Sequence, residues 1–436
     1  MSTKTIYCVF FILCSVLIGQ VKSQLCTGMA QYERCSTNAG CACLHIADSI
    51  SVGICSYLSS ITVCSQLVKC DTYNRCYAPN HECTYHPKCQ STPLCFPVSS
   101  FNRALCPLIA VTNTTTTTAI PTTTTTRTPQ IVIPNIPPNA KWTQNGVTIA
   151  GGNGWGNANN QLYEPYGLFV DDNQTVFIAD YENHRIMQWK EGNTTNGQVT
   201  AGANGQGNRL DQLNSPTDVL IDKETDSLII CDWRNRRVVR WSRRSGTTQG
   251  EILIDNIDCG GLAMDDQRYL YISDPEKHEV RRYESGDVNG TLVAGGNCLG
   301  NGTSHLNGVT YLFVDRQQNV YVSDNYNHRV MKWSKDAKEG IVVAGGQGEG
   351  NALTQLNYPN GLFVDMFGTL YVADTWNHRV MRWTQGAQQG TVIVGGNGHG
   401  AGANQFSYPT GSSFDRHGNV YVADESNHRV QQFSLQ

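Results

Sequence analysis

The chain has 436 residues, which is enough for two or three domains. Its formal net charge of −4 gives no overall field that would draw the protein to nucleic acid or to a membrane surface. Cysteine is the informative residue type: of 17 in all, twelve lie between Cys26 and Cys106, and only three follow.

Residues 1–23 have the pattern of a secretory signal peptide. Lys4 precedes an apolar run from Ile6 to Ile18, and a short polar stretch then ends at Ser23. The run is shorter than the roughly 20 residues that a membrane-spanning helix needs, and no second such run follows. We therefore expect cleavage after Ser23 and a secreted, extracellular protein without a membrane span.

Residues 24–106 hold the twelve cysteines, an even number that suits a disulfide framework in an oxidising compartment. Six bridges are expected, and their connectivity does not follow from the spacing. A zinc module is the alternative, because three histidines lie among the cysteines. Structural zinc sites usually contain closely spaced cysteine pairs, whereas Cys41 and Cys43 form the single close pair here. We therefore expect a small disulfide-rich domain.

Residues 107–141 are rich in threonine and proline and poor in apolar side chains, so they cannot form a packed core. In a secreted chain this composition predicts an extended mucin-like linker, either O-glycosylated or unmodified. Five N-x-S/T sequons are candidate N-glycosylation sites of a secreted glycoprotein: Asn113, Asn173, Asn193, Asn289 and Asn301.

Residues 142–436 are organised by a repeated phrase, A/S-D-x-x-N-H-R-V, whose best example runs from Ser323 to Val330. Its aspartates follow one another at steps of 52, 42, 50, 50 and 50 residues: Asp180, Asp232, Asp274, Asp324, Asp374 and Asp424. Each copy contains four short strand-like runs separated by Gly, Asn and Asp, which predicts a four-stranded antiparallel sheet. Six such copies predict an all-β fold, a six-bladed β-propeller.

The way in which the propeller closes also follows from the order of the runs. The outer-strand run occurs first at Val147–Ala150, before the first phrase, and none follows Phe433. The sixth blade therefore lacks its own outer strand. We expect Val147–Ala150 to fill this place, which removes two exposed sheet edges.

The phrase, preceded by G-L-F-V-D and followed by an aromatic residue, resembles the NHL repeat over about 295 residues. Two copies depart from the pattern: the second has Asn235-Arg236-Arg237, and the third has Lys277-His278-Glu279 and lacks the Gly-rich loop. The resemblance implies a propeller fold. It also implies two classes of function, because the family includes binding proteins as well as peptidyl-hydroxyglycine lyases.

The repeated Asp, Asn, His and Arg occur once per blade at equivalent positions, whereas catalysis needs unlike residues that converge on one point. Asp at a strand end accepts backbone N–H bonds, and Asn tolerates left-handed backbone geometry. We therefore interpret these residues as structural and expect no cofactor or metal. A ring of anion-binding arginines and metal binding by the histidines are the alternatives.

Differences between the blades indicate where a ligand would bind. Loops of a meander alternate between two faces, so the phrase turns and the Gly-rich connections share one face, which we call the phrase face. Residues that enter the innermost strands line the channel mouth there and differ between blades, as a binding site requires. The candidates are Tyr166, Asp218, Tyr311, Asn360 and Thr410.

Blade two adds a run of arginines that would suit an anionic partner such as a sulfated glycan or an acidic protein, with a solvated strand edge as the alternative. These are Arg234, Arg236, Arg237, Arg240, Arg243 and Arg244. Cys259 and Cys298 each lie before an inner strand, in successive blades. We expect a disulfide between these two cysteines and a buried free thiol at Cys231.

Together these features predict a secreted, non-enzymatic glycoprotein with a monomeric propeller. Its face would serve as a binding or adhesion platform for an extracellular protein or glycan, and nucleic acid is not an expected partner. The alternative is a metal-dependent propeller enzyme, such as a peptidyl-hydroxyglycine amidating lyase or a calcium-dependent esterase or lactonase. A lyase would need three non-equivalent histidines at one zinc ion, whereas most propeller histidines belong to the phrase.

Overall fold

The computed structural model describes residues 133–134, 136–137, 139–190, 192 and 195–436, together with four short strands earlier in the chain. These strands form two antiparallel pairs: β1 (Cys41–His45) with β2 (Gly53–Tyr57), and β3 (His81–Thr84) with β4 (Leu94–Pro97). The expected signal peptide, the pairing of the twelve cysteines, most of the linker and the sequons at Asn113 and Asn193 lie outside the described residues. Within the described part of the chain, no helix is long and apolar enough to cross a membrane.

Six four-stranded antiparallel sheets make up the propeller. The first is β6 (Pro165–Val170), β7 (Val176–Asp180), β8 (Arg185–Trp189) and β9 (Gln198–Ala201). The second is β10 (Pro216–Asp222), β11 (Ser227–Asp232), β12 (Arg237–Ser242) and β13 (Glu251–Asp255). The third is β14 (Leu262–Met264), β15 (Leu270–Asp274), β16 (Glu279–Tyr283) and β17 (Thr291–Gly295).

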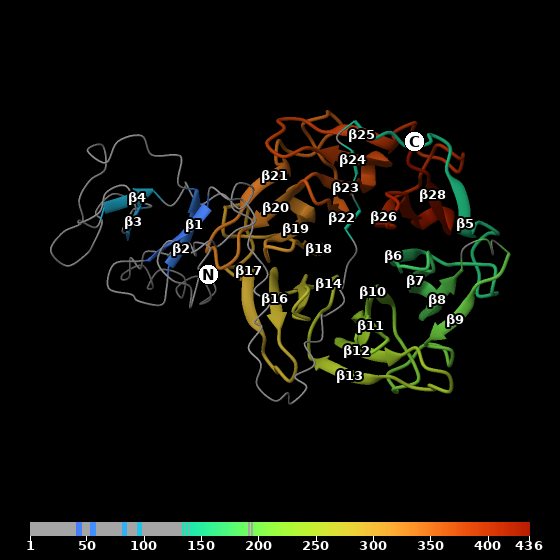
Figure 1. The fold of residues 1–436 in the computed structure, drawn as a ribbon. Coiled ribbons are helices and arrows are strands. Elements are labelled where there is room, and N and C mark those ends of the chain that lie inside the picture. Colours follow the sequence, from blue (N-terminus) through green and yellow to red (C-terminus); the bar gives the residue numbers. More distant parts are fainter. Residues whose placement is uncertain are drawn as a thin grey trace, which may run out of the picture. The chain divides into compact units, whose positions relative to one another are not determined.

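The remaining blades keep the same order. The fourth is β18 (Val309–Val314), β19 (Val320–Asp324), β20 (Arg329–Trp333) and β21 (Ile341–Gly345). The fifth is β22 (Pro359–Val364), β23 (Leu370–Asp374), β24 (Arg379–Trp383) and β25 (Thr391–Gly395). The sixth is β26 (Pro409–Phe414), β27 (Val420–Asp424), β28 (Arg429–Phe433) and β5 (Val147–Gly151). Figure 1 shows these sheets in a ring, with β6, β10, β14, β18, β22 and β26 nearest its centre.

The predicted closure of the ring is confirmed. β5 pairs antiparallel with β28, so that Ala150 lies opposite Val430. Just before β5, Trp142 is buried and its Nε1 donates to the backbone carbonyl of Gly418 at 2.8 Å. The N-terminal segment of the propeller thus supplies both the missing outer strand and a large core side chain, which anchors the closure.

The core lies between neighbouring blades. β7, β15, β19, β23 and β27 are buried at every position, because each is covered on both sides. One apolar cluster contains Ile178 of blade one together with Tyr421 of blade six. Apolar contact of this kind holds the blades together, since hydrogen bonds of the sheets run only within each blade.

The repeated phrase forms a bonded clamp inside each regular blade. In blade five, Asp374 Oδ1 accepts the backbone N–H of Asn357 at 2.7 Å, and Oδ2 accepts from Arg379 Nε at 2.7 Å and from Asn377 Nδ2 at 2.9 Å. Arg379 also donates to the carbonyl of Asn351 in the Gly-rich loop at 3.0 Å. Blades one, two, four and six repeat the ion pair between Asp and Arg. The buried charges are therefore paired and hydrogen-bonded, as burial requires.

The histidine of the phrase joins one blade to the next. His428 has a φ of 52°, and its Nδ1 accepts the backbone N–H of Glu164 at 3.3 Å, from blade six to blade one. Other blades are linked in the same way: His184 to Ser215, His278 to Gly308, His328 to Tyr358 and His378 to Tyr408. A ring nitrogen that accepts a hydrogen bond is unprotonated, so these contacts need neutral imidazoles.

The predicted disulfide between Cys259 and Cys298 is wrong, and so is the prediction of a free thiol at Cys231. Cys259 is bonded to Cys231, with 5.4 Å between their Cα atoms. The connection from β13 to β14 crosses beside the end of β11, which brings Cys259 to the neighbouring blade's buried cysteine, whereas Cys298 is exposed. The bridge covalently ties β11 of blade two to the connection that enters blade three.

Candidate functional site

A groove on the phrase face is lined by aromatic side chains of blades four to six. Tyr326 belongs to the short turn η7 (Asn325–Asn327), and Trp376 belongs to η8 (Thr375–Asn377). Tyr358 and Tyr408 precede the inner strands β22 and β26. The groove has a volume of about 620 Å³ and also reaches Tyr166 of blade one.

The aromatic side chains form a continuous row across the blades. The ring centroids of Tyr326 and Tyr358 lie 5.8 Å apart, those of Tyr358 and Trp376 5.2 Å apart, and those of Trp376 and Tyr408 5.4 Å apart. Tyr326 and Trp376 are 58% and 53% exposed, which is unusual for side chains of this size. We call these four residues the aromatic row.

The framework of the phrase positions this row. Tyr358 has a φ of 50°, and its N–H donates to His328 Nδ1, while the two rings lie edge to face with centroids 4.7 Å apart. Tyr408 stands in the same relation to His378, at 5.0 Å. The regular part of the repeat therefore holds the variable aromatic side chains of the next blade in place.

The polar side chains of the groove include one carboxyl group. Burial, together with the nearby Glu164, raises the pKa of Glu425 to about 7. Asn360 Nδ2 donates to Thr375 Oγ1 at 2.9 Å, so that amide is partly used within the protein. The groove is lined by no Lys or Arg among the described residues, and its polar groups are hydroxyls, amides and this acid.

The inner strands surround a second cavity, of about 100 Å³, in the axial channel. The strand registers show which residues of the blades are equivalent beside this cavity. Leu362 pairs with Val372, which lies two residues before the phrase aspartate of its blade, and Val219 pairs with Ile230, which lies two residues before its own. The residues just before these positions are glycine in four blades and larger in two: Gly167, Asp218, Gly261, Tyr311, Gly361 and Gly411. We call these six residues the axial ring.

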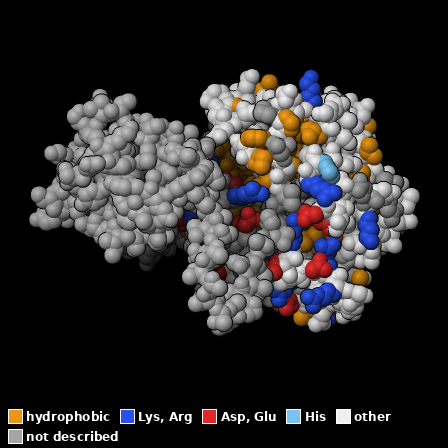
Figure 2. All heavy atoms as spheres, in the orientation of Figure 1, with side chains coloured by type: hydrophobic (Ala, Val, Ile, Leu, Met, Phe, Trp, Pro, Cys, Tyr) orange, Lys and Arg blue, Asp and Glu red, His pale blue; other side chains and the backbone are white. Residues whose placement is uncertain are grey.

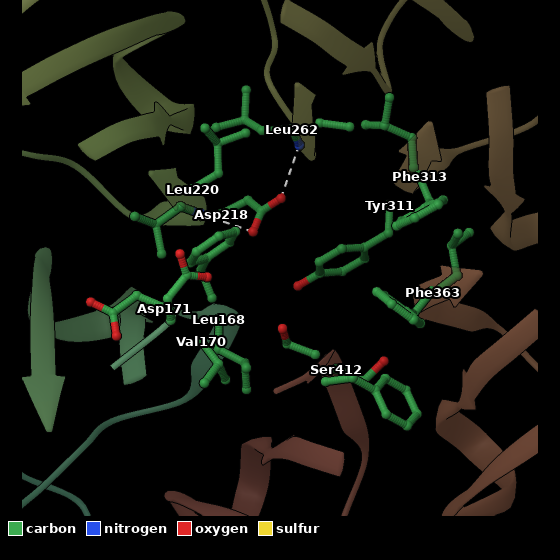
Figure 3. A pocket seen from close by; sticks show the side chains of 18 of the residues that line it. Leu168, Val170, Asp171, Asp218, Leu220, Leu262, Tyr311, Phe313, Phe363 and Ser412 are labelled. Carbon is green, nitrogen blue, oxygen red and sulfur yellow. Dashed lines mark hydrogen bonds between the residues drawn. The ribbon is translucent and has the colours of Figure 1, made fainter. Parts of the chain in front are cut away.

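Glycine in the axial ring lets neighbouring inner strands approach closely. A Cβ atom on Gly361 would lie 2.5 Å from the carbonyl oxygen of Thr410, and one on Gly167 would lie 2.4 Å from Asp218 Oδ1. The two larger members therefore use space that the glycines leave. Asp218 and Tyr311 both line the cavity, which Figure 3 shows from close by.

The five residues predicted for one ligand site belong to different places. Tyr166 and Asn360 line the groove, whereas Asp218 and Tyr311 line the axial cavity. Thr410 is 1% exposed, and its hydroxyl donates to the carbonyl of Tyr166 at 3.1 Å, which makes it a framework residue. The aromatic row escaped the sequence argument, although Tyr326 and Trp376 occupy variable positions of the phrase.

The six arginines of blade two do not form one free basic surface. Four form ion pairs: Arg236 with Glu276, Arg237 with Asp232, Arg240 with Glu251 and Arg243 with Asp226. Arg237 is buried, and the Arg234 guanidinium lies 5.5 Å from the ring centroid of Trp233. Figure 2 likewise shows basic and acidic side chains mixed near the middle of the face turned to the viewer.

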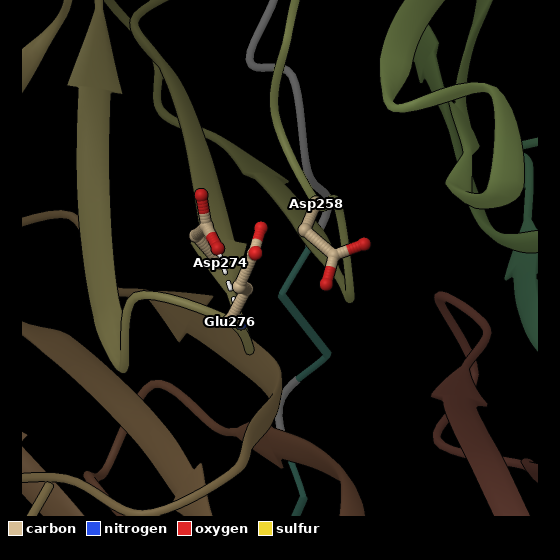
Figure 4. Close-up of side chains that lie close together, drawn as sticks. All are labelled: Asp258, Asp274 and Glu276. Carbon is tan, nitrogen blue, oxygen red and sulfur yellow. Dashed lines mark hydrogen bonds between the residues drawn. The ribbon is translucent and has the colours of Figure 1, made fainter.

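Blade three replaces the clamp by a cluster of carboxyl groups. Glu279 stands where other blades have Arg, and Asp258, Asp274 and Glu276 bring oxygen atoms within 4.8 Å of one another (Figure 4). Lys277 Nζ lies 3.0 Å from Asp274 Oδ2, an ion pair without hydrogen-bond geometry, and Arg236 lies 2.7 Å from Glu276. Two cations thus already balance two of the three acids.

These features define a class of protein, a six-bladed β-propeller with its variable residues on one face and along its axis. The model of the NHL repeat matches residues 406–433, which contain the sixth copy of the phrase. Together with the six blades, this match supports a relationship to the NHL-repeat β-propellers. No curated protein matches the sequence.

Solved structures share the fold at low sequence identity. A protein of unknown function from Bacteroides thetaiotaomicron is 18% identical, with a TM-score of 0.55 over 68% of this chain and 77% of that one. Auxiliary nutrient binding proteins from Bacteroides thetaiotaomicron and Bacteroides ovatus are each 15% identical over the same shares, with TM-scores of 0.53 and 0.52.

Proposed function

We propose that this protein is a secreted, non-enzymatic recognition protein that binds carbohydrate in the groove on its phrase face. The observation that carries the proposal is the aromatic row with its two half-exposed members, Tyr326 and Trp376. Tyr and Trp offer large rigid surfaces, and the negative face of an aromatic ring attracts the C–H groups of a sugar ring. In a monomeric protein, aromatic side chains of this size are usually more fully buried.

The other properties of the groove support the same ligand class. Its volume of about 620 Å³ is in the range of ligand sites and suits a short oligosaccharide. Hydroxyl and amide side chains can exchange hydrogen bonds with sugar hydroxyls, and the lack of lining Lys or Arg among the described residues favours a neutral sugar over a sulfated one.

Secretion and glycosylation belong to the same proposal. The signal-peptide pattern of residues 1–23 and the cysteine-rich segment support an extracellular location. The three sequon asparagines within the described residues, Asn173, Asn289 and Asn301, are all exposed. Auxiliary nutrient binding proteins with this fold offer a precedent for binding, as an analogy of fold alone.

The test is a glycan array probed with the purified full-length protein, followed by calorimetry with the neutral oligosaccharide that binds best. Trp376→Ala should weaken binding by about tenfold or more, because truncation of a central aromatic anchor commonly costs over 1 kcal/mol. The control is Phe367→Ala, since Phe367 is 52% exposed but lies in the turn between β22 and β23, away from the groove.

Two outcomes would count against carbohydrate binding in the groove. One is an equal loss of affinity in both variants, which would place the sugar elsewhere. The other is an absence of binding on the array combined with binding of a proline-rich peptide that Trp376→Ala abolishes, because aromatic grooves also receive such peptides.

A further inference from the structure

The axial cavity is separate from the groove, and the two share no lining residue. Its distinctive feature is the pair of larger side chains in the axial ring. Asp218 and Tyr311 stand where the other four blades have glycine, so this site has no equivalent elsewhere in the repeat. Symmetry therefore does not explain these two residues.

The carboxylate of Asp218 is buried without a counter-charge among the described residues. Its two oxygens accept the backbone N–H groups of Leu262 and Val219, both at 2.9 Å. Three cationic side chains near the cavity contact other groups: Lys223 lies 2.9 Å from Asp172, Arg243 lies 3.4 Å from Asp171, and Arg416 Nε donates to His417 Nε2 at 3.2 Å. A buried carboxylate of this kind is costly unless a cation or further donors reach it.

Two unpartnered oxygen atoms face the same space. The hydroxyl of Tyr311, a residue that is 6% exposed, is buried and has no hydrogen-bond partner among the described residues. Ser412 Oγ is likewise buried and without such a partner. Figure 3 shows the Tyr311 and Ser412 hydroxyls and the Asp218 carboxylate directed toward the middle of the cavity. Leucine, valine and phenylalanine side chains form most of the remaining wall.

We propose that this cavity binds a primary alkylammonium group, with its nitrogen held by Asp218, Tyr311 and Ser412. An –NH₃⁺ group has three N–H donors, which matches three oxygen acceptors, and its alkyl stem suits the apolar wall. Hard metal cations take six or more oxygen ligands, which is twice the number that these three side chains direct at one point. The volume of about 100 Å³ far exceeds the roughly 10–15 Å³ that one water needs.

The proposed binding depends on pH through Asp218. Burial raises the pKa of Asp218 to about 7, and the carboxylate must be ionised to hold an ammonium group. The other titratable groups lining the cavity are Tyr311, Asp171, Asp172, Lys223 and Arg416. Burial and the nearby Asp218 raise the pKa of Tyr311 well above its ordinary value, so the phenol remains a neutral hydroxyl. Affinity should therefore be about tenfold higher at pH 8 than at pH 6.

The test is a calorimetric titration of the full-length protein with n-butylamine at pH 8 and pH 6. Neutral n-butanol and tetramethylammonium, which has no N–H donors, are the probe controls. We expect saturable binding of butylamine alone. Asp218→Asn should reduce its affinity at least tenfold and remove the pH dependence, and Tyr311→Phe should reduce it about tenfold at unchanged pH dependence. Phe367→Ala, which changes an exposed side chain outside the cavity lining, should change little.

A second arm of the test distinguishes the source of the ammonium group. Nα-acetyl-lysine methylamide presents the same head on a peptide. Binding of both amines would assign the cavity to a lysine side chain of a partner, and binding of butylamine alone would assign it to a free amine. Three results would overturn the proposal and leave the cavity to water. They are equal binding of butanol, no saturable binding of either amine, and unchanged affinity in an Asp218→Asn variant that unfolds at the wild-type temperature.

Discussion

At the scale of single residues, the same side-chain types serve different ends according to their surroundings. The Asp and Arg of the phrase form buried ion pairs in five blades, such as Asp374 with Arg379. Asp218 is also a buried carboxylate, yet it faces a cavity and has no such partner among the described residues. Regular repetition therefore marks the framework here, and a departure from it marks a candidate site.

The phrase histidines make a residue-scale prediction about pH. Burial lowers the pKa of His428, so the folded protein takes up a proton there less readily than the unfolded chain. The stability that His428 contributes is thus present above the unfolded pKa of about 6.5 and is lost as the pH falls. Asparagine tolerates the left-handed backbone at this position. His428→Asn should therefore lower the free energy of unfolding only through the lost hydrogen bond, by about 1 kcal/mol at pH 7.5.

This difference between wild type and His428→Asn should shrink at pH 5, as followed by urea unfolding at both pH values. Protonation of Nδ1 already breaks the bond to Glu164 in the wild type. A difference that stays constant or grows toward acid pH would contradict the role of His428 as a neutral acceptor between blades six and one.

At the scale of elements, the strands and their order could be predicted because each copy repeats the same short apolar runs and turn residues. The closure by β5 followed from counting outer strands. The disulfide could not be predicted, because the approach of Cys259 to Cys231 depends on how the connection from β13 to β14 crosses the neighbouring blade. Sequence spacing alone favoured Cys298, which is exposed.

The bridge between β11 and the connection from β13 to β14 gives an element-scale prediction. Because the linked cysteines are 28 residues apart, Cys259→Ser should lower the free energy of unfolding by about 2–4 kcal/mol. Peptide mapping of the unreduced protein should find Cys231 linked to Cys259. A peptide that links Cys259 to Cys298 instead, or equal stability of the variant, would contradict the pairing.

The candidate sites were only partly predictable, because some of their residues come from elements that only the fold brings together. Asp218 and Tyr311 could be chosen from the sequence, because they enter inner strands at positions that differ between blades. The aromatic row could not, since Trp376 comes from a phrase turn whereas Tyr358 and Tyr408 come from the starts of inner strands. Only the folded ring brings these positions together.

At the scale of the whole molecule, the propeller separates stability from recognition. Clamps, histidine links and inter-blade apolar clusters recur around the ring and hold it together. The aromatic row is confined to blades four to six, and the two larger members of the axial ring, Asp218 and Tyr311, are confined to blades two and four. An even distribution of framework bonds allows the variable positions to change without loss of the fold, which is how one fold serves many functions.

The most direct test of this separation compares two adjacent residues of one turn, Trp376 and Asn377. Asn377 Nδ2 bonds to Asp374 at 2.9 Å and to the carbonyl of Gly350 at 2.8 Å, so Asn377→Ala should lower the free energy of unfolding by about 1–3 kcal/mol. Trp376→Ala should leave stability within about 0.5 kcal/mol and weaken glycan binding by about tenfold or more. Urea unfolding and glycan binding should be measured on both variants. The separation of stability from recognition would be contradicted if Trp376→Ala unfolded the propeller or bound the glycan like the wild type.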